Sequence, residues 1–195
     1  MSRIETPLAR EEREKYEQVW AECELYHRSS PGLRHAPEAW GWYLTNECHS
    51  MIDFGCGDGR TMAWFSELGC QDVMGVDIAH RRSDILQLPL WKPVPEAWHK
   101  DFGFSCDVLE HIPTEMVPAC IENMAEATRK AAWIQVAMFE DTAGTTGDWG
   151  QLHLTVKPLP WWRHALGRHF KIVHATERKR RATFLCLTRD THGTD

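Results

Sequence analysis

Three glycines at alternate positions follow an apolar segment in the stretch "MIDFGCGDGR", residues 51–60. Because glycine has no side chain, Gly55, Gly57 and Gly59 allow a ligand to lie directly against the backbone. Their GxGxG spacing differs from the GxGxxG turn of nicotinamide-binding proteins, in which a pyrophosphate rests on a helix N-terminus. Asp53, two residues before the first glycine, opposes a pyrophosphate and suits a cationic group. The turn therefore predicts a positively charged ligand.

A second acidic residue extends this prediction. Asp77 ends the apolar stretch "DVMGVD" and lies 18 residues after Gly59. An acidic residue at the end of a second strand accepts hydrogen bonds from both hydroxyls of a ribose. A cation joined to a nucleoside fits both carboxylates, and S-adenosylmethionine, with S-adenosylhomocysteine as its product, is such a ligand.

Two histidines are candidates for general-base catalysis, which a methyl acceptor that carries a proton can require. His111 lies in "DVLEHIP" and His153 in "GQLHLTV", and each could equally be a structural histidine held by hydrogen bonds. The eleven histidines show neither HExxH nor any paired ligand spacing, so no metal site is predicted.

Apolar periodicity and glycine or proline signals place strands and helices in alternation. Helices are predicted at 8–27, 37–47, 60–68, 114–130 (with Thr114 as N-cap) and 160–170, and strands at 49–54, 72–76, 102–106, 132–139, 171–175 and 183–188. This order predicts an α/β fold: a three-layer, Rossmann-like, mainly parallel sheet with an antiparallel C-terminal hairpin strand.

The 195 residues, of which 43% are hydrophobic, predict one domain. Within it we expect an N-terminal helical lid segment (1–48), a cofactor-binding core (49–139) and a substrate-side loop, helix and hairpin (140–195). The net charge of −6 argues against the nucleic-acid backbone as main partner, and the charged run "ERKRR" (177–181) is interpreted as a solvated turn. The charged N-terminus, scattered cysteines and lack of a long apolar run predict a cytoplasmic protein without a membrane span.

The chain resembles the class I S-adenosylmethionine-dependent methyltransferases of small-molecule type. The resemblance covers residues 49–139 well and 150–189 loosely. "MIDFGCGDGR" is similar to the family's first motif, "VMGVDIA" to its second, and "DFGFSCDVLEHIP" to its fourth strand and the loop that follows. It implies a seven-stranded sheet with the last strand inserted antiparallel.

The resemblance also implies roles for individual residues. The methionine half would be lined by Asp53, Phe54, Gly55, Cys56 and Gly57. Asp77 would bind the ribose and Ile78 the adenine, Cys106 and Asp107 would lie under the cofactor, and His111 would face the cofactor or the substrate. Tyr26 would belong to a lid over the cofactor and would contact the substrate, and His153 would face the substrate.

The connection after Asp77 departs from the family. Only six residues separate Asp77 from Asp84, too few for the usual second crossover helix, so we expect that helix to be reduced or absent and the third strand to be short. The adenine contact then has two possible positions. The pattern "SDILQLP" indicates Asp84 and Ile85, which we prefer, whereas counting back from Asp101 indicates Pro89, Leu90 and Trp91.

Together these features predict a methyltransferase that acts on a small molecule by in-line displacement, as a monomer or homodimer. One alternative is a catalytically silent protein that binds the cofactor or a partner, which the missing helix would explain. A nucleic-acid methyltransferase is a weaker alternative, because the chain has neither a D/N-P-P-Y/F motif nor a Pro-Cys dipeptide.

Overall fold

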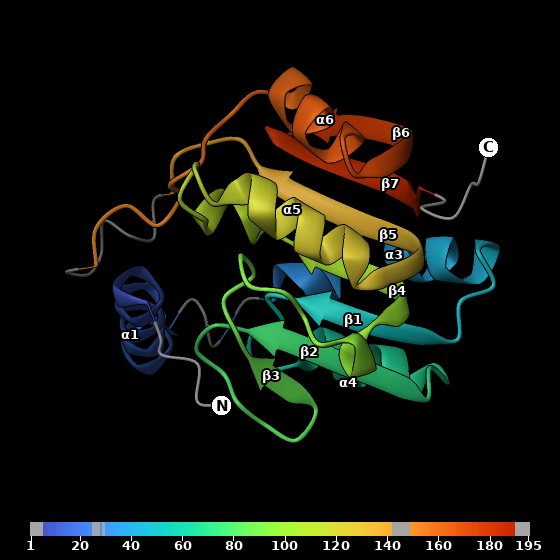
Figure 1. Cartoon of the computed structure of the whole chain (residues 1–195), viewed down its shortest axis with the longest axis horizontal. Helices are drawn as coiled ribbons and strands as arrows, with labels where there is room; N and C mark the ends of the chain where they lie inside the picture. Colours follow the sequence, from blue (N-terminus) through green and yellow to red (C-terminus); the bar gives the residue numbers. More distant parts are fainter. Residues whose placement is uncertain (1–5, 25–27, 29, 142–148, 190–195) are drawn as a thin grey trace.

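The computed structural model describes residues 6–24, 28, 30–141 and 149–189. Its strands form one seven-stranded sheet in the order β3-β2-β1-β4-β5-β7-β6 (Figure 1). β1 to β5 pair in parallel, and β7 runs antiparallel to both β5 and β6. The strands are β1 (Ser50–Phe54), β2 (Asp72–Asp77), β3 (Ile85–Gln87), β4 (Lys100–Cys106), β5 (Thr128–Ala137), β6 (Phe170–Arg178) and β7 (Arg181–Thr188). The predicted Rossmann-like sheet with an antiparallel C-terminal strand is confirmed.

Helices cover both faces of the sheet. α5 (Val117–Glu126) and α6 (Leu159–Gly167) pack on one face, and α3 (Pro31–Thr45) and α4 (Arg60–Glu67) on the other. α1 (Pro7–Glu22) lies beyond the carboxyl ends of β1 and β2 (Figure 1). Two short 3₁₀ helices, η1 (Glu96–Trp98) and η2 (Leu109–His111), flank β4. No helix among the described residues is long and apolar enough to cross a membrane.

β1 is buried along its whole length, as expected for a central strand covered on both faces. Successive side chains alternate between the faces. Met51 joins the core against α3 and α4, whereas Ile52 and Phe54 join the core against α5 and α6. Asp53 therefore ends the strand on the face opposite Phe54, and this alternation decides which side chain reaches the ligand side of the turn.

The short connection after Asp77 has the predicted form. Residues 78–84 contain no helix, and β3 consists of three residues at the edge of the sheet. Arg82 and Ile85 exchange backbone hydrogen bonds of 3.2 Å, which close the connection into a tight loop. Losing a crossover helix at a sheet edge leaves the central strands covered.

Two predicted helix boundaries in the N-terminal part of the chain are wrong. α1 ends at Glu22, not at residue 27. α3 begins at Pro31, not at residue 37, because the Ser30 hydroxyl accepts a 3.2 Å hydrogen bond from the Leu33 N–H and caps the helix. Proline has no N–H group and is therefore well suited to the first helical position, so the helix begins at Pro31.

α5 is shorter than predicted at both ends. Thr114 does not cap it: the Thr114 hydroxyl bonds the Thr155 hydroxyl at 2.8 Å, and the helix begins at Val117. At the other end the Thr128 hydroxyl donates a 2.7 Å hydrogen bond to the Met124 carbonyl, and Thr128 already belongs to β5. Thr128 is thus the first strand residue although it continues the apolar period of the helix.

Candidate active site

The glycine turn connects β1 to α4 in a backbone conformation that requires glycine. Gly55, Gly57 and Gly59 have φ angles of +75°, +52° and +83°, a region that side-chain-bearing residues rarely adopt. A Cβ at Gly57 would lie 2.6 Å from the ring of Trp20, and one at Gly55 would lie 2.5 Å from Val108. The glycines therefore provide both the turn and the space for the elements packed on it.

Asp77 holds this turn from the end of the neighbouring strand. Its carboxylate accepts hydrogen bonds from the backbone N–H groups of Gly57 at 2.9 Å, Ala79 at 2.8 Å and His80 at 3.0 Å. Burial alone disfavours the charge, but the His80 ring and these backbone donors outweigh it, and the pKa of Asp77 lies below its usual value. Asp77 is therefore a carboxylate at neutral pH.

Asp53, unlike Asp77, favours its protonated, neutral form. It is 3% exposed, and burial together with the negative charge of Asp77 raises the pKa of Asp53 to about 8. A carboxyl group in this position becomes charged readily only when a cation lies next to it. The end of β1 therefore suits a cationic group better than an anionic one.

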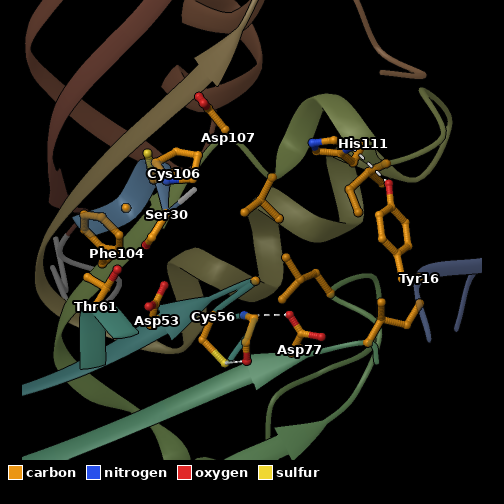
Figure 2. A pocket seen from close by; sticks show the side chains of 18 of the residues that line it. Tyr16, Ser30, Asp53, Cys56, Thr61, Asp77, Phe104, Cys106, Asp107 and His111 are labelled. Carbon is orange, nitrogen blue, oxygen red and sulfur yellow. Dashed lines mark hydrogen bonds between the residues drawn. The ribbon is translucent and has the colours of Figure 1, made fainter. Parts of the chain in front are cut away.

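Both carboxylates line a cavity of about 350 Å³ at the carboxyl ends of the strands, where ligands bind in open α/β sheets. In Figure 2, Asp53 and Asp77 lie on one side with Cys56 between them, and Asp107 and His111 lie across the pocket. The predicted site residues that line it are Asp53, Gly55, Cys56, Gly57, Asp77, Ile78, Cys106, Asp107, His111 and His153. Tyr26 lies outside the described residues.

Three predicted cofactor residues do not line the pocket. Phe54 is 1% exposed and points into the core against α5 and α6. Asp84 pairs with Arg82 at 2.6 Å, and Ile85 is buried in β3. The pocket wall consists instead of residues 88–91, which include the alternative position Pro89–Trp91. Without a crossover helix, the chain after β3 turns back across the sheet end and supplies this wall.

Sequence reasoning put α1 in the expected lid segment but missed the two side chains that line the pocket from it. Tyr16 and Trp20 both line the pocket, and the Tyr16 hydroxyl lies 3.0 Å from Nδ1 of His111 (Figure 2). The Trp20 ring meets the ring of His80 edge-on at 4.5 Å between centroids. In the sequence, Tyr16 and Trp20 are four residues apart and so belong to one apolar face of a helix. Such a face is equally typical of a helix packed on any core and does not indicate a pocket.

His111 and His153 come together although 41 residues lie between them in the chain. Their rings meet edge-on with centroids 4.7 Å apart. Nδ1 of His111 lies 3.1 Å from the Leu152 carbonyl, and Nδ1 of His153 lies 2.6 Å from the Phe139 carbonyl. Burial, and then the neighbouring His153, lower the pKa of His111 to about 3, so its imidazole is neutral.

Arg181 closes the pocket from the terminal hairpin. Its Nε donates a 3.2 Å hydrogen bond to Asp107, and its guanidinium lies 4.8 Å from the ring centroid of Phe139. Asp107 itself has φ of +52°, a strained value for a residue with a side chain. The interpretation of 177–181 as a purely solvated run is therefore wrong for Arg181.

Solved structures with the same fold include three methyltransferases. The chain shares 17% identity and a TM-score of 0.68 with the 1,6-didemethyltoxoflavin-N1-methyltransferase of Burkholderia thailandensis, solved with its substrate and S-adenosylhomocysteine, over 97% of this chain and 93% of that one. With the N-methyltransferase NodS of Bradyrhizobium japonicum it shares 13% identity and a TM-score of 0.65, over 90% of this chain and 99% of that one. With the magnesium protoporphyrin IX methyltransferase of Synechocystis it shares 15% identity and a TM-score of 0.61, over 90% of this chain and 93% of that one.

No curated protein matches the sequence significantly. The sequence profile described as "Methyltransferase domain" matches residues 8–183, which include α1, the glycine turn, the histidine pair and most of the terminal hairpin. The match spans most of the chain, and the structure places the matched motifs around one pocket at the end of a methyltransferase-type sheet. The chain therefore belongs to this methyltransferase domain family.

Proposed function

We propose that the protein uses S-adenosylmethionine to methylate a small molecule. One observation supports this proposal: the acidic side chains of Asp53 and Asp77 both line the pocket next to a turn of three glycines. A ligand with a charged amino group at one end and a ribose further along satisfies both.

The residues present fit this cofactor. Asp53 would bind the amino group, and the turn at Gly55 and Gly57 would pass close to the methionine chain. The Asp77 Oδ2 accepts one hydrogen bond among the described contacts and retains lone-pair capacity for a ribose hydroxyl. Ile78 and residues 88–91 would enclose the adenine in place of Asp84 and Ile85.

Bound S-adenosylmethionine supplies an electrophilic methyl group on a sulfonium sulfur. The task of the chain is then to hold the acceptor in line with that methyl group, and positioning of this kind accounts for much of the rate enhancement. The acceptor end of the pocket is lined by His111, His153, Phe139 and Arg181. Because the pKa of His111 is about 3, its imidazole would be a weak base, and its role would be to position the acceptor.

The size and cover of the pocket favour a small acceptor. A cavity of about 350 Å³ lies within the range of about 300–1,000 Å³ typical of small-molecule sites. α1 contributes Glu12, Tyr16 and Trp20 to its lining and so covers part of it. The three neighbours named above include enzymes for a didemethyltoxoflavin and a porphyrin, both small molecules.

Calorimetric titration with S-adenosylhomocysteine tests the first half of the proposal. We expect one binding site per chain, and a complete lack of binding would refute the proposal. The second half needs a methyl-label transfer assay against fractionated cell extract, with mass identification of the labelled product. Binding without transfer in any fraction would favour the catalytically silent alternative.

A further inference from the structure

Glu110 is a buried carboxylate that the proposed methyl transfer does not use. It is 0% exposed, and its Oε1 accepts a 2.8 Å hydrogen bond from the Ala137 N–H. Its Oε2 is buried and has no hydrogen-bond partner in the described part of the chain. An ionised carboxylate with a buried oxygen that lacks a donor is unfavourable unless a cation compensates it, and without a cation such a group holds a proton.

The two histidines beside Glu110 are oriented like metal ligands. A carbonyl oxygen can only accept, so the carbonyls of Leu152 and Phe139 favour the tautomers that carry the proton on Nδ1. In that tautomer of His111 the Tyr16 hydroxyl oxygen, 3.0 Å from the same Nδ1, shares the proton as a second acceptor. Nε2 of His111 and Nε2 of His153 then carry the lone pairs. An imidazole whose other N–H is bound to a backbone carbonyl is the usual arrangement around a metal ion, because that hydrogen bond fixes the tautomer and the ring orientation.

The three side chains converge. One ligand-capable atom from each of Glu110, His111 and His153 lies within 4.8 Å of the other two. Bonds of about 2.0–2.2 Å to one ion place ligand atoms roughly 3–4 Å apart, so a contraction of about 1 Å would close the site. Binding an ion would therefore require the three side chains to move by this amount. We propose that Glu110, His111 and His153 bind a divalent transition-metal ion.

The donor set selects the class of ion. Two imidazoles and one carboxylate are the protein ligands of many catalytic zinc sites and of non-haem iron sites. Mg²⁺ and Ca²⁺ prefer oxygen donors and are expected to bind poorly here. The sequence did not reveal the site, because only Glu110 and His111 are adjacent and His153 reaches them through the loop after β5.

The position of the site suggests what the ion does. His111 and His153 both line the pocket, so the remaining coordination positions of the ion would face the acceptor end. A Lewis acid there would orient an acceptor and favour its deprotonation. This role rests on the proposed function, whereas binding of the ion itself does not.

The test is metal titration of the protein without cofactor or acceptor. After treatment with a chelator and its removal, we expect one equivalent of Co²⁺ to give visible absorption bands and Zn²⁺ to displace it. Glu110→Gln, which keeps an oxygen for the Ala137 N–H, and His153→Gln should each weaken the affinity by about 100-fold or more. The control His164→Gln/His174→Gln removes two exposed histidines and should bind like the wild type.

A second measurement on the folded wild type avoids dependence on the stability of the variants. Long-range ¹⁵N–¹H spectra should show Zn²⁺ shifting the signals of two histidines, which remain in the control variant. Lack of a 1:1 Co²⁺ or Zn²⁺ complex, shifts in other histidines, or unchanged affinity in folded Glu110→Gln would refute the proposal. Metal binding without binding of S-adenosylhomocysteine would uphold the metal site and refute the proposed function.

Discussion

The carboxylate of Asp77 accepts a 2.9 Å hydrogen bond from the backbone N–H of Gly57. This bond ties the end of β2 to the glycine turn after β1, between two strands that run side by side. The residue expected to bind the ribose therefore also shapes the turn that receives the methionine half. Stability and cofactor affinity should consequently respond together when Asp77 is changed.

Replacing Asp77 by Asn tests this coupling. The Asn side chain keeps one oxygen that can accept a hydrogen bond, but an NH₂ group replaces the other carboxylate oxygen. That NH₂ group would then face a backbone N–H group, which is also a donor. A lost hydrogen bond to a buried charged group costs about 1–3 kcal/mol, so urea unfolding should show a decrease of that size in the free energy of unfolding. Affinity for S-adenosylhomocysteine should fall by at least about 10-fold.

Asp84→Asn is the matched control, because Asp84 pairs with Arg82 in the same connection but does not line the pocket. We expect it to leave the affinity for S-adenosylhomocysteine unchanged. Equal losses of affinity in both variants would mean that the adenine contact lies at Asp84–Ile85 after all.

Asp53 should make stability depend on pH. Its pKa is about 8 in the folded chain and about 3.9 in an unfolded one. Between these values the folded state holds one more proton, so the Asp53 contribution to the free energy of unfolding falls as pH rises, by up to about 1.4 kcal/mol per pH unit. Asp53→Asn removes this dependence. Urea unfolding at pH 5.5 and 7.5 should therefore show the variant gaining stability relative to the wild type at the higher pH.

Cofactor binding should release the same proton. A ligand amino group beside Asp53 favours the carboxylate, so at pH 6.5 close to one proton should leave the protein on binding of S-adenosylhomocysteine. Calorimetry in two buffers with different ionisation enthalpies measures this number directly. Asp53→Asn should bind more weakly and release almost none, and a wild type whose binding enthalpy is independent of the buffer would contradict the assignment.

The fold could be predicted because its signals are local. The apolar run before the glycines, the stretch that ends at Asp77 and the segment that ends at Cys106 all form neighbouring strands as expected. The short connection after Asp77 also predicted the missing crossover helix. Apolar runs indicate buried strands and glycines indicate turns from the local sequence alone, so these patterns predicted the strands and their sequence along the chain.

The rest of the site depends on contacts between distant segments, which no local pattern reports. Nothing near Tyr16 indicates that its hydroxyl lies next to His111, and the stripe that contains it suits any packed helix. Arg181 sits in a charged run, and only the pairing of β5 with β7 brings it to Asp107. The predicted start of α5 is wrong for a related reason: the Thr114 hydroxyl bonds Thr155, from a later segment, instead of capping the helix.

Gly57 should not tolerate a side chain. Gly57→Ala places a methyl group 2.6 Å from the ring of Trp20 and keeps φ at +52°. The left-handed conformation alone costs about 1–2 kcal/mol, and the clash adds to it. We expect the loss of unfolding free energy to exceed 2 kcal/mol. In Gly57→Ala/Trp20→Ala the clash is gone, and the backbone cost and the lost packing of Trp20 remain, so the double variant should lose less than the sum of the two single variants. Strict additivity in this cycle would show that α1 does not rest on the turn.

Arg181 should matter to the pocket, whereas its exposed neighbour Arg178 should not. Arg181→Gln removes the charged donor of the buried Asp107, whose Oδ1 has no hydrogen-bond partner among the residues described. Leaving a buried carboxylate without its cation costs about 1–3 kcal/mol, and thermal and urea unfolding should both show the loss. The control Arg178→Gln removes the same charge from the exposed end of β6 and should change neither stability nor methyl transfer. Because both variants lower the positive charge of the hairpin equally, equal loss of activity would indicate a nucleic acid bound at this turn, and loss only in Arg181→Gln would place the effect at Asp107.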